Sequence, residues 1–458
     1  MVFSSISFIF YFLPLVLGIY YLMAKRYRNA VLFLASLVFY FIGEGPLTII
    51  FIISIIWHYL VGRLIEKYHK KSILIIGILF DIALLGYFKY ANFVVDNLNL
   101  LGLNIKLAKI ILPIGISFFT FQGMSYLADV YSKSVKAADS LVDFGAYLAL
   151  FPQLIAGPIV RYEDVANDLK NRQENSDDFV AGIRRFIIGL SKKTILADSL
   201  GFAAKTFAEL SSRTILSSWL EALAITLQLY FDFSAYSDMA IGIGLLFGFH
   251  FLENFNYPLF ATSITDFWRR WHISLGTWFK DYIYIPLGGS RVKPFRRVIN
   301  IMAVWFLTGL WHGANWTFIF WGVYFGVILL LEKYFYLDKL KKHPFIGWVY
   351  TFIIVLMGFV IFNSDSLALA FDFIAGMWGI KGLALWDSQC LYYLKNFLVL
   401  LLVSFILAAP WLKDFFKQKI KASTFKDIIV YCSLAILFLL SLSYLVANSF
   451  SPFLYFRF

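Results

Sequence analysis

Two histidines lie inside aromatic, apolar stretches of this sequence. His312 stands in FLTGLWHGANWTFIFWG (Phe306–Gly322), and His272 stands in TDFWRRWHISLGTWFKDYIYIPLGG (Thr265–Gly289). A buried imidazole can be a core residue bonded to a backbone carbonyl, a metal ligand or a general base. A metal is disfavoured, because the histidines are far apart in sequence and no nearby carboxylate has ligand spacing. The remaining chemical role is that of a base, since a neutral imidazole in apolar surroundings can accept a hydroxyl proton near pH 7.

Charged residues accompany the second histidine. If this segment is helical, Asp266, Arg269 and Arg270 lie within one turn, flanked by Trp268 and Trp271. Such a mixture is typical of a membrane interface, where tryptophan anchors a helix and arginine extends toward the headgroups. The functional alternative is that the two arginines bind an anionic ligand, for which phosphate is the first candidate.

The composition indicates that a membrane surrounds these residues. Of the 458 residues, 60% are hydrophobic and 15% are charged, whereas about 25% are charged in a soluble domain. Apolar runs near the ~20 residues that cross a bilayer recur along the chain, and the ~10-residue alternating segments of a membrane β-barrel are absent. We therefore predict an all-α, polytopic integral membrane protein with about 11–13 transmembrane helices.

The basic residues set the expected orientation of the chain. The net charge of +12 falls in short clusters between apolar runs, which is the pattern of cytoplasmic loops rather than of a nucleic-acid-binding surface. With these clusters inside, the polar stretch 161–179 is a cytoplasmic loop and both termini are extracytoplasmic. The first run, Phe8–Met23, lacks a basic leader and a cleavage site and is predicted to be a span. Cys390 and Cys432 are expected to be free.

The apolar runs also predict where the spans lie. Residues 141–160 and 266–287 are interrupted by proline, glycine or charge and are expected to be re-entrant or interfacial pieces. The run 217–250 is long enough for one span plus a broken extension. The expected spans are 5–23, 30–43, 46–62, 72–88, 110–129, 183–208, 217–250, 298–312, 315–331, 345–363, 395–411 and 427–448.

Four further ionisable residues lie within apolar runs, where charge is costly and each one is a candidate for function. Asp232 and Asp238 are six positions apart in LQLYFDFSAYSDMAIGIG. Their structural interpretation is a set of hydrogen bonds, or an arginine partner, that holds a broken helix. Asp81 and Lys89 lie about two turns apart on roughly one helix face, and we expect them to make structural pairings.

Four blocks together identify a resemblance. They are FPQLIAGPIVRYED (151–164), QLYFDFSAYSDMAIGIG (228–244), NYPLFATSITDFWRRWHISLGTWFKDYIYIPLGG (256–289) and TGLWHGANWTFIFWG (308–322). In this order they resemble the membrane-bound O-acyltransferase family, and within it the bacterial branch that O-acetylates exported polysaccharides such as alginate. The N-terminal third resembles the family only in hydropathy.

The resemblance implies roles for particular residues. His312 matches the family's catalytic histidine, and His272 matches a second recurring polar residue, which we treat as auxiliary. The C-terminal ANSFSPFLYFRF is similar to an aromatic motif of this branch, in which the tyrosine, here Tyr455, is a proposed transient acyl carrier. Further candidates for substrate or cofactor binding are Arg269, Arg270, Trp268, Trp311, Asn315, Asp232, Asp238 and Gln153.

It also implies an architecture and a reaction. The expected architecture is one membrane-embedded domain over 1–458, a helical ring around a thin core, with its motif core at 151–322 and an extracytoplasmic tail at 449–458. In a bacterial cell membrane, acetyl-CoA from the cytosol would be the donor substrate, with no permanently bound cofactor. An extracytoplasmic SGNH-type esterase or transferase would then pass the acetyl group to an exported polysaccharide.

Two other functions remain open at this stage. The teichoic-acid D-alanylation subunit shares the FW-R-WH and GLWHG elements, so the cargo could be a D-alanyl group from a carrier-protein thioester. A proton-coupled secondary transporter would use His312 and the buried acids as a proton relay. The motifs do not identify the acceptor polysaccharide.

Overall fold

The computed structural model describes residues 1–154, 157–411 and 424–447, and Tyr455 with the predicted tail 449–458 lies outside these residues. Within them the chain is helical, and the one β-type pairing is an isolated bridge between Phe255 and Trp271. The all-α prediction is confirmed. The chain forms two compact units, Met1–Phe186 with Tyr236–Glu253 and Ile187–Ala235 with Asn254–Phe458, which are described separately below.

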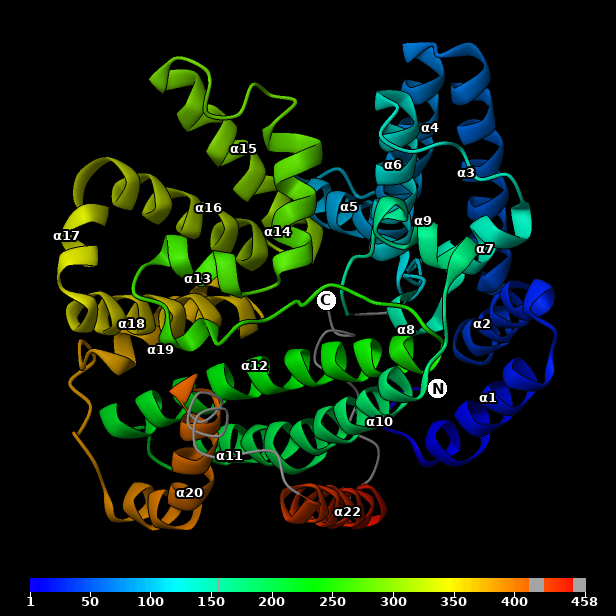
Figure 1. The fold of residues 1–458 in the computed structure, drawn as a ribbon. Coiled ribbons are helices and arrows are strands. Elements are labelled where there is room, and N and C mark those ends of the chain that lie inside the picture. Colours follow the sequence, from blue (N-terminus) through cyan, green and yellow to red (C-terminus); the bar gives the residue numbers. More distant parts are fainter. Residues whose placement is uncertain (155–156, 412–423, 448–458) are drawn as a thin grey trace. The chain divides into compact units, whose positions relative to one another are not determined.

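Unit 1 is a set of helices that includes the N-terminus. In it α3, α4 and α6 pack against one another, and α2 packs against α7 (Figure 1). Its elements, counting short 3-10 and π-helical segments as η, are η1 (Phe8–Phe12), α1 (Leu13–Leu22), η2 (Lys25–Tyr27), α2 (Arg28–Glu44), η3 (Gly45–Leu47), α3 (Thr48–Tyr68), α4 (Lys71–Leu85), η4 (Gly86–Tyr90), α5 (Ala91–Leu100), α6 (Ile116–Ser132), α7 (Leu141–Ala149), α8 (Phe151–Leu154) and α9 (Tyr162–Asn171).

The boundary between the units falls within two helices, α10 (Ser176–Ser191) and α12 (Ile215–Leu246). Unit 2 then contains η5 (Lys192–Ala197), α11 (Asp198–Ala208), η6 (Pro258–Phe260), α13 (Ile264–Arg270), α14 (Ile273–Phe279), η7 (Lys280–Tyr284), α15 (Pro294–His312), α16 (Trp316–Leu331), η8 (Glu332–Tyr336), α17 (Leu337–Lys342), α18 (Pro344–Asn363), α19 (Leu367–Met377), α20 (Ser388–Leu407) and α22 (Thr424–Ala447).

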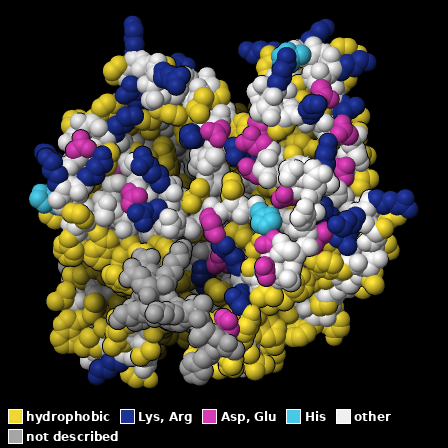
Figure 2. All heavy atoms as spheres, in the orientation of Figure 1, with side chains coloured by type: hydrophobic (Ala, Val, Ile, Leu, Met, Phe, Trp, Pro, Cys, Tyr) yellow, Lys and Arg dark blue, Asp and Glu magenta, His cyan; other side chains and the backbone are white. Residues whose placement is uncertain are grey.

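Six apolar helical segments among the described residues are long enough to cross a bilayer. They are Lys25–Tyr68, Lys71–Leu100, Trp316–Lys342, Pro344–Asn363, Ser388–Leu407 and Asp427–Ala447. In unit 2, α20 and α22 expose many large hydrophobic side chains, and Figure 2 shows broad hydrophobic surface over α20. Such extensive exposed apolar area suits contact with lipid. The count of 11–13 spans stays a prediction.

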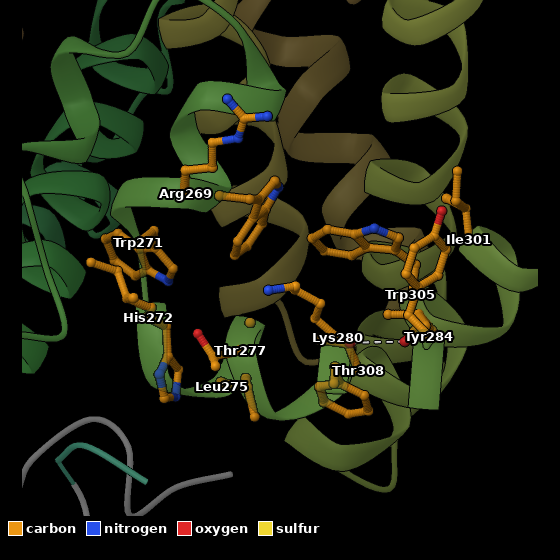
Figure 3. Close-up of a pocket in the computed structure, with 15 residues that line it drawn as sticks. Arg269, Trp271, His272, Leu275, Thr277, Lys280, Tyr284, Ile301, Trp305 and Thr308 are labelled. Atoms are coloured by element: carbon orange, nitrogen blue, oxygen red, sulfur yellow. Dashed lines mark hydrogen bonds between the residues drawn. The ribbon is translucent and has the colours of Figure 1, made fainter. Parts of the chain in front are cut away.

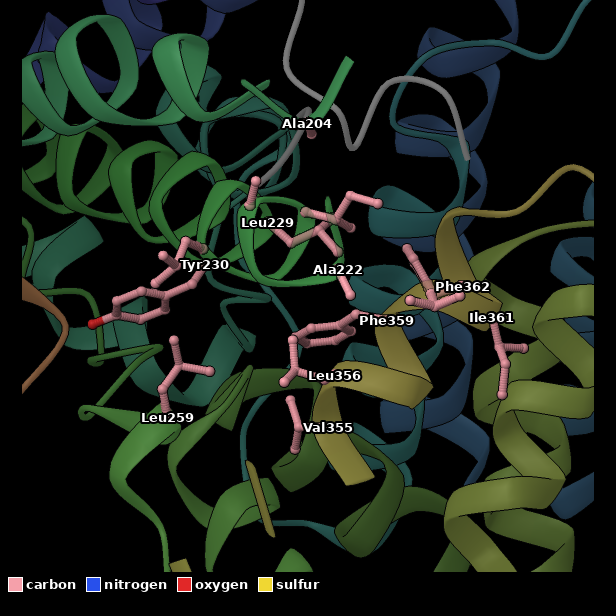
Figure 4. Close-up of a cluster of buried hydrophobic side chains, with 14 of the residues drawn as sticks. Ala204, Ala222, Leu229, Tyr230, Leu259, Val355, Leu356, Phe359, Ile361 and Phe362 are labelled. Atoms are coloured by element: carbon pink, nitrogen blue, oxygen red, sulfur yellow. The ribbon is translucent and has the colours of Figure 1, made fainter. Parts of the chain in front are cut away.

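The core of unit 2 places the elements that carry the site. A continuous cluster of buried side chains joins α12 to α13, α16 and α18. Figure 4 shows the part of this cluster contributed by α12 and α18. Phe359 and Leu356 of α18 belong to it, as do Leu229 and Tyr230 of α12. Because these rings and aliphatic groups fill the space between helices, the short α13 is fixed by packing although it is too brief to be stable alone.

One expectation about local structure is wrong. The broken extension expected in the run 217–250 is not found, because α12 continues as one helix to Leu246, with 32 residues and a length of about 48 Å at ~1.5 Å per residue. The polar stretch 161–179 contains α9 and the start of α10, and its place on the cytoplasmic side stays a prediction. The helix considered around Asp266 is α13, which includes Arg269 and Arg270 and ends before Trp271. Cys390 and Cys432 are free, as predicted.

Helices α15 and α16 touch through glycine. A Cβ atom added to Gly322 would lie 2.2 Å from the carbonyl oxygen of Trp305 and 3.1 Å from the Cα of Gly309. Only a residue without a side chain allows the two backbones to approach so closely. This contact positions the C-terminal end of α15, where His312 lies.

We expect Gly322→Ala to lower the free energy of unfolding by about 1–3 kcal/mol, because the α15 backbone must move to admit the methyl group. The measurement is the thermal unfolding midpoint in detergent. Gly18→Ala in α1 is the matched control, since nothing lies within 4 Å of the added Cβ. Equal midpoints for the two variants would contradict the argument.

Candidate active site

A pocket of about 400 Å³ lies between α13, α14, η7 and α15 in unit 2 (Figure 3). Its wall is mainly apolar and aromatic, which is typical of a small-molecule site with a few placed polar groups. The lining residues are Trp268, Arg269, Trp271, His272, Ile273, Leu275, Gly276, Thr277, Phe279, Lys280, Tyr284, Ile301, Val304, Trp305 and Thr308.

The break between α13 and α14 brings His272 to this wall. Trp271 is extended and forms the bridge to Phe255, and His272 has a left-handed backbone with φ of 47°. This conformation is uncommon for a residue other than glycine and occurs where the surrounding structure imposes it. The turn ends one helix and starts the next, so the imidazole lies beside Thr277 in the pocket.

His272 is almost fully buried, with 2% of its surface exposed. Its Nδ1 lies 3.3 Å from Oδ1 of Asn254, and the Phe233 ring packs against it edge-on at 4.7 Å between centroids. The residue lies outside the six apolar candidate spans, and burial lowers the pKa of its imidazole to about 3. The ring is therefore neutral near pH 7 and can accept a proton or a hydrogen bond.

His312 is the last residue of α15 and is 7% exposed. Its ring packs edge-on against Trp321 and Phe362, each at 5.1 Å between centroids. Trp311 packs against both histidines, with its ring centroid 5.0 Å from that of His312 and 6.0 Å from that of His272. The structure thus brings both predicted histidines, forty positions apart, to one indole, and of the two only His272 lines the pocket.

Two cationic side chains reach the same pocket. Arg269 makes no ion pair among the described residues, and in Figure 3 its guanidinium points away from His272. Lys280, whose side chain is 65% exposed, extends toward the middle of the pocket on the side of Thr277 (Figure 3). Within the part of the chain that the structure describes, its one ion-pair contact is with Asp281, at 3.7 Å. No carboxylate belongs to the pocket lining.

Comparison with known sequences decides the family. The sequence model of the membrane-bound O-acyltransferase family matches residues 116–371, which include the pocket and both histidines. The chain is 41% identical, over the whole length of both proteins, to the probable alginate O-acetylase AlgI of Azotobacter vinelandii. The chain belongs to the membrane-bound O-acyltransferase family.

Two other relatives of this O-acyltransferase are enzymes with different acceptors or acyl groups in their names. It is 35% identical to the peptidoglycan O-acetyltransferase of Helicobacter pylori, over 84% of this chain and 81% of that protein. It is 30% identical to the teichoic acid D-alanyltransferase of Bacillus subtilis, over 55% of this chain and 68% of that protein. Family membership and the apolar helices make it a multi-pass membrane enzyme that transfers acyl groups.

The predicted anion-binding pair of the acyltransferase is divided by the structure. Arg269 lines the pocket together with Trp268, whereas the Arg270 Nε donates to Oδ1 of Asp266 at 2.9 Å. Arg270 is absent from the pocket lining. One arginine is therefore available to a ligand, and the other holds the first turn of its own helix.

The remaining predicted residues of the acyltransferase lie elsewhere. Asn315 caps α16 by accepting from the Thr317 N–H at 3.1 Å. In unit 2, Asp232 pairs with Lys193 at 2.8 Å, and in unit 1, Asp238 pairs with Arg185 at 2.8 Å. The buried Gln153 of unit 1 donates to the Tyr147 carbonyl oxygen at 2.6 Å. The two aspartates have the structural partners foreseen, but the helix that carries them is unbroken.

Several polar residues were missed from the sequence. Lys280 and Asn254 lie in or beside the pocket, and the buried Glu332 accepts from the N–H groups of Ile264 and Thr265 at 2.5 and 2.8 Å. Only the position of Lys280 in the quoted WRRWHISLGTWFKDY segment could have pointed to it.

The two ionisable residues predicted to make structural pairings do so in unit 1. In unit 1, Asp81 pairs with the buried His58 at 2.9 Å, and Lys89 donates to Ser117 at 3.0 Å. Asp81 and Lys89 thus make structural pairings as expected, though with residues of other helices. Across the described residues, no group of three His, Cys, Asp or Glu side chains could hold a metal ion.

Proposed function

We propose that this acyltransferase takes an acetyl group from acetyl-CoA and passes it across the membrane for O-acetylation of an exported polysaccharide. The observation that carries the proposal is the pocket, which joins two cations, no carboxylate and a neutral imidazole in one apolar space. Arg269 and Lys280 suit the phosphates of coenzyme A, and the apolar wall suits its thioester arm. The names of the alginate and peptidoglycan relatives support a polysaccharide as final acceptor.

In the proposed reaction His312 is the general base. It removes the proton of an acceptor hydroxyl as the oxygen attacks the thioester carbonyl carbon. The tetrahedral intermediate then collapses, the C–S bond breaks, and the coenzyme A thiolate takes the proton from the imidazolium. The aromatic rings around His312 exclude water, which favours transfer over hydrolysis of the thioester.

We further propose Tyr455 as the first acceptor, on the basis of the motif resemblance alone. A phenol with its reference pKa of ~10 needs a base to become a nucleophile, and a histidine can supply one. This role requires the C-terminus to be extracytoplasmic, as the distribution of basic residues predicts. A separate SGNH-type esterase or transferase outside the membrane would then move the acetyl group from the tyrosine to the polysaccharide.

The test of the donor uses the purified protein in detergent with radiolabelled acetyl-CoA or with a D-alanyl carrier-protein thioester. Acetyl label on the intact protein, absent from Tyr455→Phe, supports the proposed donor and acceptor. If the label is lost in a His312 variant but kept in Tyr455→Phe, acetyl-CoA remains the donor and a residue other than Tyr455 is the acceptor. Transfer from the D-alanyl thioester alone, with the partner protein present, overturns the acetyl assignment.

Arg269→Ala should raise the KM for acetyl-CoA about tenfold with little change in kcat, because it removes one charged contact to the donor. Initial rates over a range of donor concentrations measure this effect. Arg270→Ala is the neighbouring control, and it should change KM less than about twofold, since a partly exposed i,i+4 ion pair contributes under ~1 kcal/mol. A larger KM effect at Arg270 would place the donor phosphates on the other side of α13.

A further inference from the structure

The side chain of Asn254 is the polar neighbour that orients His272. Asn254 is fully buried, and its Oδ1 lies 3.1 Å from the backbone N of Ser274 and 3.0 Å from Ser274 Oγ. The same oxygen lies 3.3 Å from Nδ1 of His272. The backbone carbonyl of Asn254 accepts from the N–H of Ile273 at 3.0 Å. The backbone and the side chain of Asn254 are therefore both bonded to the residues that follow His272.

These contacts indicate which ring nitrogen carries the proton. The Ser274 hydroxyl also lies 3.5 Å from Nδ1, but its shorter contact, at 3.0 Å, is the hydrogen bond that it donates to Asn254 Oδ1. A backbone N–H can only donate, so the atom of Asn254 that faces Ser274 is its oxygen and not its amide nitrogen. An oxygen can only accept, and the ring nitrogen that faces it must therefore be the donor. The neutral imidazole has a single N–H, which places the hydrogen on Nδ1 and leaves a lone pair on Nε2.

The second ring nitrogen is placed for a substrate. Nε2 of His272 is buried and has no hydrogen-bond partner among the described residues. The residue lines the pocket, and the edge-on rings of Phe233 and Trp311 hold the imidazole in its orientation. A buried acceptor left without a donor costs about 1–3 kcal/mol, which a bound N–H or O–H group would recover.

We propose that Asn254 is a positioning residue that fixes His272 as the Nδ1–H tautomer, so that Nε2 accepts a hydrogen bond from an N–H or O–H group of the substrate in the pocket. The inference deepens the proposed function and rests on it for the identity of that substrate. Asn254 itself does not line the pocket and acts through the ring.

The first test observes the tautomer without using activity. Solid-state NMR on protein with ¹⁵N-labelled histidine, in lipid bilayers, distinguishes protonated from unprotonated ring nitrogens, and a His272→Gln difference spectrum assigns the signal. The wild type should show His272 with Nε2 unprotonated. Asn254→Leu should lose this signature. A wild-type signal with the proton on Nε2 overturns the proposal.

The second test separates positioning from a merely structural role. Asn254→Leu should lower kcat about 10- to 100-fold, because in the other tautomer Nε2 of His272 carries the proton and no longer accepts a hydrogen bond from the substrate. Asn254→Asp should retain most activity, since a carboxylate also accepts from Nδ1–H. In the pH profile of kcat, the acid limb of Asn254→Asp should move to higher pH, because the carboxylate stabilises the inactive imidazolium of His272.

Ser274→Ala is the matched control. It removes the hydroxyl that donates to Asn254 at 3.0 Å and lies 3.5 Å from Nδ1 of His272, and it keeps the backbone and imidazole donors to Asn254. It should keep near-wild-type kcat. Asn254→Leu that unfolds at the wild-type temperature and keeps the wild-type kcat overturns the proposal. If acetyl-CoA proves not to be the donor while the Nδ1–H tautomer is observed, the proposed function fails and the positioning of His272 stands.

Discussion

His312→Ala should lower acetyl transfer by about a thousandfold, near the limit of detection, while the protein stays folded. General base catalysis by a positioned side chain contributes about 10²–10⁴-fold, and water that replaces the imidazole is a poor base in a site walled by aromatic rings. The measurement is the rate of label transfer from radiolabelled acetyl-CoA, with size-exclusion behaviour and thermal unfolding checked in parallel.

Two further variants separate chemistry from packing at this position. His312→Gln nearly preserves volume and hydrogen bonding but cannot serve as a base, so it should be as inactive as His312→Ala with a smaller loss of stability. His343→Ala, at an exposed histidine before α18, is the control for loss of an imidazole and should have wild-type activity. Substantial activity in His312→Gln would mean that His312 is a core residue and that another group takes the proton.

Glu332→Ala should have the largest effect on stability, with a loss on the order of 3 kcal/mol. The carboxylate of Glu332 is fully buried and accepts from the Ile264 N–H, the Thr265 N–H and the Thr265 hydroxyl. It therefore satisfies the start of α13, the helix that carries Trp268 and Arg269 to the pocket. Without it these buried donors have no acceptor, and the negative charge at a helix N-terminus is lost.

The expected result is a lower unfolding midpoint together with a raised donor KM, because the displaced α13 moves the pocket wall. Glu332→Gln keeps one acceptor oxygen and should fall between the wild type and alanine. Asp338→Ala, at an exposed acid six residues further on, should change neither quantity. If Glu332→Ala lowers stability and leaves donor KM at the wild-type value, the start of α13 does not control the pocket.

The sequence could predict the class of the fold, because hydropathy is a local property that each apolar run shows by itself. It could not predict where helices break. Asp266 to His272 contains no proline or glycine, and α13 ends at Arg270 because Trp271 pairs with Phe255, which comes from a distant turn. Conversely, α12 continues through glycine and polar residues because its surface is buried on both halves of its length.

The sequence predicts the site residues that belong to a recognisable motif. It does not predict the residues whose role depends on tertiary contacts. His272 and His312 stand out as imidazoles in apolar sequence, and the structure brings them to one tryptophan. Asn254 and Glu332 are ordinary polar residues at the edges of apolar runs. Asn254 contacts His272, 18 positions away, and Glu332 contacts Ile264 and Thr265, 68 and 67 positions away. The periodicity of the sequence carries no information about such distant partners.

The two cations of the pocket predict inhibition of the enzyme by its product, free coenzyme A. Under the proposed assignment, Arg269 and Lys280 contact the phosphates of the donor, and these phosphates are unchanged when the acetyl group leaves. Free coenzyme A should then compete with acetyl-CoA at comparable affinity, because the contacts that supply most of the binding are common to both. Such a site responds to the ratio of acetylated to free coenzyme rather than to the donor concentration alone. Modification of the cell surface would slow whenever the carbon supply of the cell declines.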